Sequence, residues 1–177
     1  LQAGVFPASI QDLYAARGRR RAPANFTVPA VNIRGFPYDT ARALFRAAKR
    51  LRVGAVLCEI AKSEIGYTAQ KPEEYTTVCL SAAIREGYRG PVFVQGDHVQ
   101  VNAKNFASNP AKERDAMRAL IREEIAAGFY NIDIDSSTLV DYSKPSIEEQ
   151  QRLNGEICAE MTAYIREIEP KGVSVSI

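Results

Sequence analysis

Five short apolar runs, separated by segments with helical periodicity, constrain the fold of this chain more than any other feature. Near-continuous apolar runs are typical of parallel strands that are covered on both faces. The runs lie at residues 27–33, 53–60, 90–96, 129–135 and 172–177. The segments between them predict helices at residues 40–50, 72–85, 110–127 and 146–168. The order βαβαβαβαβ therefore predicts an α/β fold with a parallel sheet.

Two architectures fit this order of elements. One is a doubly wound open sheet, and the other is a (β/α)8 barrel that is cut after its fifth strand. The first strand is not followed by the pattern GxGxxG, and the chain has no P-loop pattern. These absences disfavour the nucleotide-binding form of the open sheet. Periodicity alone leaves both architectures open.

The composition of the chain argues against nucleic acids and membranes as binding partners. The 177 residues carry a formal net charge of only +2, and no apolar run approaches the roughly 20 residues of a membrane helix. The three cysteines lie far apart, which favours reduced thiols. We therefore expect a cytoplasmic protein without nucleic-acid or membrane partners. Four arginines within residues 17–21 are a candidate phosphate site, but a solvated helix end is the favoured interpretation.

Polar residues gather at the carboxyl ends of the predicted strands. These residues are Asn32 and Arg34, Glu59 and Lys62, Asp97 and His98, and Asp133 and Asp135. In parallel α/β folds the carboxyl ends of the strands meet at one edge and build the active site. Four separate strand ends that deliver polar groups to one edge indicate a small-molecule site.

The pair formed by Asp97 and His98, the only histidine, suits either metal binding or proton transfer. A capped loop histidine is the alternative interpretation, and it is favoured on spacing alone. Asp133 and Asp135 share one face of an extended strand, where two like charges require a cation or a basic partner. Asp135, at the strand end, is the better functional candidate, and Asp133 is better explained as a structural acceptor.

Four segments together resemble the class II, metal-dependent fructose- and tagatose-bisphosphate aldolases. They are residues 27–33 (TVPAVNI), 90–98 (GPVFVQGDH), 128–136 (GFYNIDIDS) and 171–177 (KGVSVSI). Two further segments, residues 56–59 (VLCE) and 66–75 (GYTAQKPEEY), are more similar to the accessory Z-type subunit of tagatose-bisphosphate aldolase. The resemblance covers roughly residues 26–177 and all five predicted strands.

The resemblance implies a (β/α)8 barrel, of which this chain holds about the first five strands, with a catalytic Zn2+ ion. It implies that Asp97 transfers a proton, that His98 and Asp135 belong to the metal site, and that Asn32 contacts the substrate. The zinc would polarise the carbonyl of a ketose phosphate during aldol cleavage or condensation. Ala61 and Val99 depart from the family pattern, which has a serine and a small residue at these positions.

The domain prediction has two parts, an N-terminal leader or helix at residues 1–25 and the first part of a single barrel domain at residues 26–177. The chain begins at Leu1 and ends in a predicted strand, so we expect a piece of a longer protein. Further ligands would come from residues absent from this chain, in a homo-oligomer or with a complementing chain. A non-catalytic accessory subunit and an unrelated α/β small-molecule-binding protein remain the alternatives.

Overall fold

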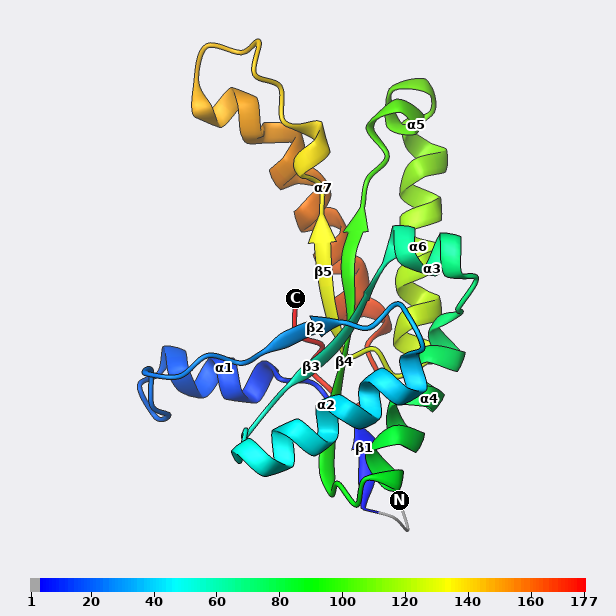
Figure 1. Ribbon diagram of the computed structural model, residues 1–177. Helices are drawn as coiled ribbons and strands as arrows, with labels where there is room; N and C mark the ends of the chain where they lie inside the picture. The colour runs from blue at the N-terminus through cyan, green and yellow to red at the C-terminus, as the bar shows by residue number, and fades with distance from the viewer. Residues whose placement is uncertain (1–3) are drawn as a thin grey trace.

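The computed structural model describes residues 4–177, in which helices surround a parallel β-sheet (Figure 1). The strands are β1 (Val5–Pro7), β2 (Ala30–Asn32), β3 (Leu57–Ala61), β4 (Gly90–Gln100) and β5 (Asn131–Asp135). The helices are α1 (Gln11–Gly18), α2 (Pro37–Leu51), α3 (Lys62–Thr68), α4 (Pro72–Arg85), α5 (Ala103–Ser108), α6 (Pro110–Ala126) and α7 (Ile147–Ile168), with a 3-10 turn, η1, at Ser137–Leu139.

Strands β2, β3, β4 and β5 lie side by side in chain order, and every pair is parallel. The short strand β1 pairs with the first three residues of β4. The register places Asn32 beside Glu59, Glu59 beside Gln95, and Gln95 beside Asn131. The predicted α/β fold with a parallel sheet is therefore confirmed, and the order of β2 to β5 contains no reversal.

The two faces of the sheet differ in chemistry. One face packs against the helices through a large apolar core that includes Cys58, Val94 and Phe45 of α2. On the other face, Leu57 and Phe93 form a small cluster beneath Ile10 at the start of α1. Farther along β3 and β4, this second face becomes polar. All five residues of β3 are buried, and Glu59 is the charged one among them.

The C-terminal segment differs from the prediction. Instead of a strand at residues 172–177, the segment makes one isolated parallel bridge, between Ser176 and Asn131. Within residues 172–177, only Ser176 makes backbone hydrogen bonds to the β5 side, donating to the carbonyl of Tyr130 and accepting from the N–H of Ile132 (both 2.9 Å). The backbone groups of Val175 point away from β5 and bond to side chains at the end of α7, the N–H to Glu169 (2.9 Å) and the carbonyl to Arg166 (2.8 Å). The edge of the segment that faces away from β5 is thus occupied by side chains.

The N-terminal segment contains β1 and α1, and β1 joins the sheet. The prediction for these residues was only a leader or helix. A three-residue strand that ends in Pro7 gives almost no periodic signal. Arg17, in the arginine cluster, lies over the ring of Phe26 (4.8 Å) and donates a hydrogen bond to the carbonyl of Ala24 (3.2 Å). Among residues 4–177, none of the helices has the length and apolar character needed to cross a membrane.

A carboxyl group is buried between α6 and β4. Glu124 is fully buried, and neither of its carboxyl oxygens has a hydrogen-bond partner among the described residues. Burial, together with the nearby charge of Glu123, raises the pKa of Glu124 to about 8, and Lys62 opposes this shift. The carboxyl group is therefore neutral in the folded protein at pH 7.

We expect the Glu124→Gln variant to lose a pH dependence of stability. Between the ordinary pKa of a glutamate and about 8, folded Glu124 keeps a proton that the unfolded chain releases. The free energy of unfolding should therefore fall as pH rises from 5 to 8, by at most roughly 1.4 kcal/mol per pH unit. Urea unfolding across this range should show that fall in the wild type and in Glu123→Gln, and a smaller fall in Glu124→Gln, where the raised pKa values of Glu59 and His98 still contribute. An identical slope in all three proteins would contradict the assignment.

Candidate active site

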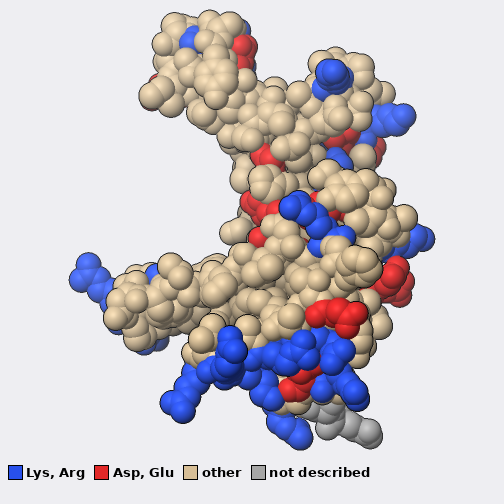
Figure 2. Space-filling model, in the orientation of Figure 1, with Lys and Arg blue, Asp and Glu red and all other residues tan. Residues whose placement is uncertain are grey.

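A polar cleft of about 600 Å³ lies at the carboxyl ends of the strands. Its lining residues come from β2, β3, α3, β4 and the segment that enters α5: Asn32, Arg34, Ala61, Lys62, Ser63, Glu64, Asp97, His98, Gln100, Asn102 and Asn105. Figure 2 shows acidic side chains in the hollow part of the surface, whereas lysines and arginines gather over α2 at the opposite end. The predicted gathering of strand-end residues is therefore present.

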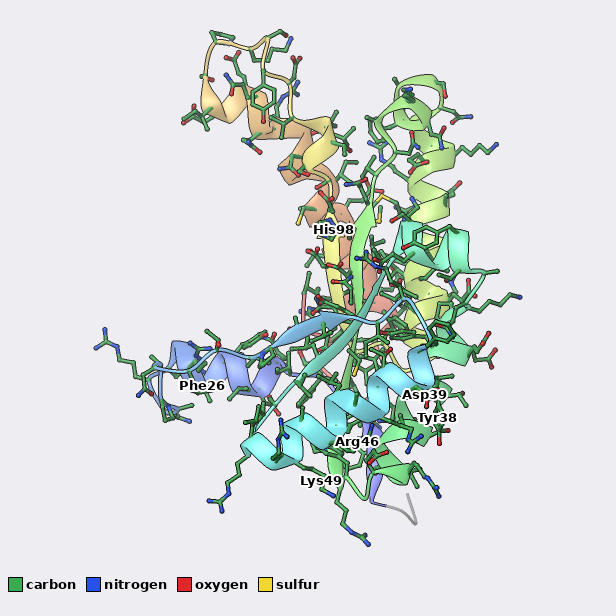
Figure 3. All side chains as sticks on the ribbon, in the orientation of Figure 1. Phe26, Tyr38, Asp39, Arg46, Lys49 and His98 are labelled. Carbon is green, nitrogen blue, oxygen red and sulfur yellow. The ribbon has the colours of Figure 1, made fainter. Side chains whose placement is uncertain are left out.

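A backbone irregularity in β4 presents Asp97 and His98 together. The register between β4 and β5 shifts between Gly96 and Val99, and His98 adopts a positive φ of 48°. Such a bulge places two residues opposite one and redirects their side chains. His98 consequently projects from the sheet near the ends of β4 and β5 (Figure 3). The Nε2 atom of His98 lies 3.6 Å from Oδ1 of Asp97.

Asp135 contacts the other nitrogen of the imidazole ring. Its Oδ2 atom lies 3.2 Å from Nδ1 of His98 and accepts a hydrogen bond from Nε2 of Gln100 (2.5 Å). Its Oδ1 atom accepts hydrogen bonds from the backbone N–H and the hydroxyl of Ser137. Partial burial opposes ionisation, but the hydrogen bonds from Ser137, Gln100 and His98 lower the pKa of Asp135 to about 2. The contact with Asp135 in turn raises the pKa of His98, partial burial opposes this shift, and Asp97 and Asp133 add to it.

Asp97 is held on its other side by Asn32. Asn32 Nδ2 donates to Oδ2 of Asp97 (2.7 Å) and also to Oε2 of Glu64 (3.2 Å). Glu64 accepts a further hydrogen bond from the N–H of Ala61 (2.9 Å) and pairs with Arg34. Burial opposes the ionisation of Glu64, but these three partners lower its pKa overall. The arrangement fixes Asp97 at the floor of the cleft.

Lys62 also lines the cleft and pairs with Glu113, which lies outside the lining. Lys62 Nζ donates to the carbonyl of Gln100 (2.7 Å) and lies 3.4 Å from Oε1 of Glu113. Glu113 is buried and also accepts hydrogen bonds from the backbone N–H of Asn102 (2.8 Å) and the amide of Asn105 (3.3 Å). The two cations that line the cleft, Lys62 and Arg34, are thus each paired with a glutamate.

Asp97, His98 and Asp133 form a group that could hold a metal ion. Each offers one ligand atom, and these atoms all lie within 4.8 Å of one another. Beneath them lies Glu59, whose pKa is raised to about 7 by burial first and then by the charges of Asp97 and Asp133. Among the described residues, no lysine or arginine forms an ion pair with Glu59, Asp97, Asp133 or Asp135. An added cation would relieve this crowding of negative charge.

The structure brings all four predicted site residues together. Asn32, Asp97 and His98 line the cleft, while Asp135 contacts Nδ1 of His98 and is not a member of the three-residue group. Asp133, predicted to be a structural acceptor, belongs to that group and also accepts from the backbone N–H of His98 (3.3 Å). Whether these residues bind metal or substrate remains a prediction.

The sequence analysis missed several residues of the cleft, among them Glu64 and Gln100. Glu64 stands three residues after Ala61, at the third position of α3, where a glutamate commonly reaches back to the start of a helix. That spacing could have identified it. Gln100 is recognisable only once β4 is known to extend beyond residue 96.

Comparisons with known proteins show a similarity of fold. No protein-family model matches the chain, and no curated protein sequence matches it significantly. Among solved structures, it is similar to a probable tagatose 6 phosphate kinase from Sinorhizobium meliloti 1021, with a TM-score of 0.56 and 20% sequence identity. The match covers 78% of this chain and 37% of that one, so the matched region spans little more than a third of the neighbour. At this identity, the likeness shows the fold alone.

Proposed function

We propose that this chain forms part of a metal-dependent, aldolase-type lyase that cleaves or forms a carbon–carbon bond in a ketose phosphate. One observation carries the proposal: His98 and several carboxylates converge in a polar cleft, without a lysine or arginine ion pair to those carboxylates among the described residues. The resemblance of the strand segments to the class II aldolases supplies the reaction type. The neighbour's name, which refers to a tagatose phosphate, is compatible with the substrate class.

The fold proposal follows from the strand order. Parallel strands that add in chain order, with the polar cleft at their carboxyl ends, are what the first strands of a (β/α)8 barrel require. A doubly wound sheet would instead reverse its order at the site. We therefore propose that residues 26–177 are the first part of a barrel domain.

The donor set fits a divalent cation such as Zn2+. Imidazole nitrogen and carboxylate oxygen are both ligands that zinc accepts, and His98 Nε2 and Asp133 would hold the ion next to Asp97. A bound cation would supply a Lewis acid that polarises the substrate carbonyl. Since His98 is the only histidine in the chain, further ligands would come from the substrate, water or other residues.

The chain's own residues would position the substrate and move a proton. Asp97, hydrogen-bonded by Asn32 through Oδ2, keeps Oδ1 toward the cleft and would transfer the proton of the reacting hydroxyl or carbon. The amides of Asn32, Gln100 and Asn102 line the cleft and suit sugar hydroxyls. Arg34, which pairs with Glu64 but keeps a 61% exposed side chain, would contact a phosphate group.

A second candidate is the accessory, non-catalytic subunit. The similarity of residues 56–59 and 66–75 to the accessory Z-type subunit of tagatose-bisphosphate aldolase favours it. In that case the cleft would support a catalytic partner chain.

An activity assay of the full-length protein tests the proposal. Cleavage of fructose and tagatose bisphosphates should be lost after treatment with a chelator and restored by Zn2+. Cleavage that is insensitive to the chelator would contradict the metal-dependent mechanism. If the protein is inactive by itself but stimulates an added catalytic aldolase subunit, the result would favour the accessory role.

A further inference from the structure

The surroundings of His98 distinguish its two ring nitrogens. Nδ1 faces the Asp135 carboxylate at 3.2 Å, whereas the nearest carboxylate oxygen of Asp97 lies 3.6 Å from Nε2. Asn32 donates to Oδ2 of Asp97, so that Oδ1 is the oxygen that faces Nε2. Asp135 therefore offers the shorter contact to the ring.

Hydrogen bonds hold the side chain of Asp135 in one orientation. Ser137 donates to its Oδ1 through both the backbone N–H (3.1 Å) and the hydroxyl (2.5 Å), and Gln100 donates to its Oδ2. The carboxylate is thus fixed at both oxygens, and its side chain is only 12% exposed. The bulge at residues 96–99 sets the backbone conformation of His98, and this determines the direction in which its side chain leaves the strand.

We propose that Asp135 is a positioning residue, which accepts the Nδ1–H of neutral His98 and so leaves the Nε2 lone pair facing Asp97. A carboxylate that fixes the tautomer of a ligating histidine is a general means of tuning a metal site. The use of Nε2 as a ligand rests on the proposed function, but the tautomer itself does not. Asp135 then acts through His98 and is not itself a ligand, which differs from the role that the resemblance implied.

The single histidine makes the tautomer directly measurable. Long-range 1H–15N correlation spectra of the metal-free protein, recorded where the ring is neutral, contain only the signals of His98. We expect a protonated Nδ1 and an unprotonated Nε2 in the wild type. A protonated Nε2 in the wild type would overturn the proposal without any variant.

The chain also provides a matched control. Asp141 accepts hydrogen bonds from the backbone N–H (3.0 Å) and hydroxyl (2.6 Å) of Ser143, the same Asp-x-Ser turn as at Asp135, but it has no contact with His98. In Asp135→Ala, the His98 signals should shift to the Nε2–H form, and they should stay unchanged in Asp141→Ala. Equal behaviour of the two folded variants would overturn the proposal.

Metal binding gives a second readout. Zn2+ titrated into the protein should bind roughly 10- to 100-fold more weakly to Asp135→Ala than to the wild type, with Asp141→Ala unchanged. A changed tautomer with unchanged Zn2+ affinity would refute the positioning role. Because neither measurement uses turnover, both remain decisive if the lyase assay fails.

Discussion

Replacement of Gly96 by alanine should destabilise the protein by about 3 kcal/mol, the upper part of the range for an overpacked core. A Cβ at this position would lie 2.5 Å from Oε2 and 2.7 Å from Cδ of Glu124. Glu124 is fully buried, so its carboxyl group has little room to move. Because Asp97 follows Gly96 directly, the strain should also disturb the bulge that presents Asp97 and His98.

Gly155→Ala is the matched control for this prediction. Gly155 lies within α7, and a Cβ added there would meet no atom within 4 Å beyond its own helix backbone, so alanine should be neutral or stabilising by about 0.5–1 kcal/mol. Urea unfolding of both variants measures the difference. Combining Gly96→Ala with Glu124→Ala should recover part of the loss, because the overlap is removed. Equal stability of Gly96→Ala and wild type would contradict the close packing of Glu124 on β4.

Asp97→Asn should lower turnover by about 10²- to 10⁴-fold and leave the metal content of the full-length protein largely unchanged. The amide keeps the size of the side chain and can still accept the hydrogen bond from Asn32, but it cannot transfer a proton. His98→Ala, by contrast, should lose both metal and turnover. Steady-state kinetics with metal analysis of each variant makes the comparison.

The control for Asp97→Asn is Asp141→Asn, which alters an exposed aspartate in a loop away from the cleft and should retain wild-type turnover. If Asp97→Asn also retained its turnover, Asp97 would have no part in proton transfer. If it instead lost the metal, Asp97 would be a ligand.

The elements with strong local signals were predictable from the sequence. Helix α6 begins at Asn109, whose side chain accepts from the N–H of Lys112, and α7 begins at Ser146, which caps in the same way. The positions of β2 to β4 followed from their apolar runs. Strand β1 depends on a distant partner, β4, which no local pattern reveals.

Which residues belong to the candidate site could largely be predicted from the sequence, but how their side chains are arranged could not. Asn32, Asp97, His98 and Asp135 could be identified because parallel strands bring their carboxyl ends together. The roles of Asp133 and Asp135 depend on the shift of register between β4 and β5 and on the positive φ of His98. Neither feature has a signal in the sequence, since both result from the packing of the two strands.

Zinc titration calorimetry on the full-length protein tests the central claim, a metal site at His98, most directly. We expect one Zn2+ ion per chain in the wild type, and loss of that binding in His98→Ala and in Asp133→Asn, whose side chains offer two of the three converging ligand atoms. Binding of equal strength in the wild type and both variants, or no binding to the wild type, would contradict it.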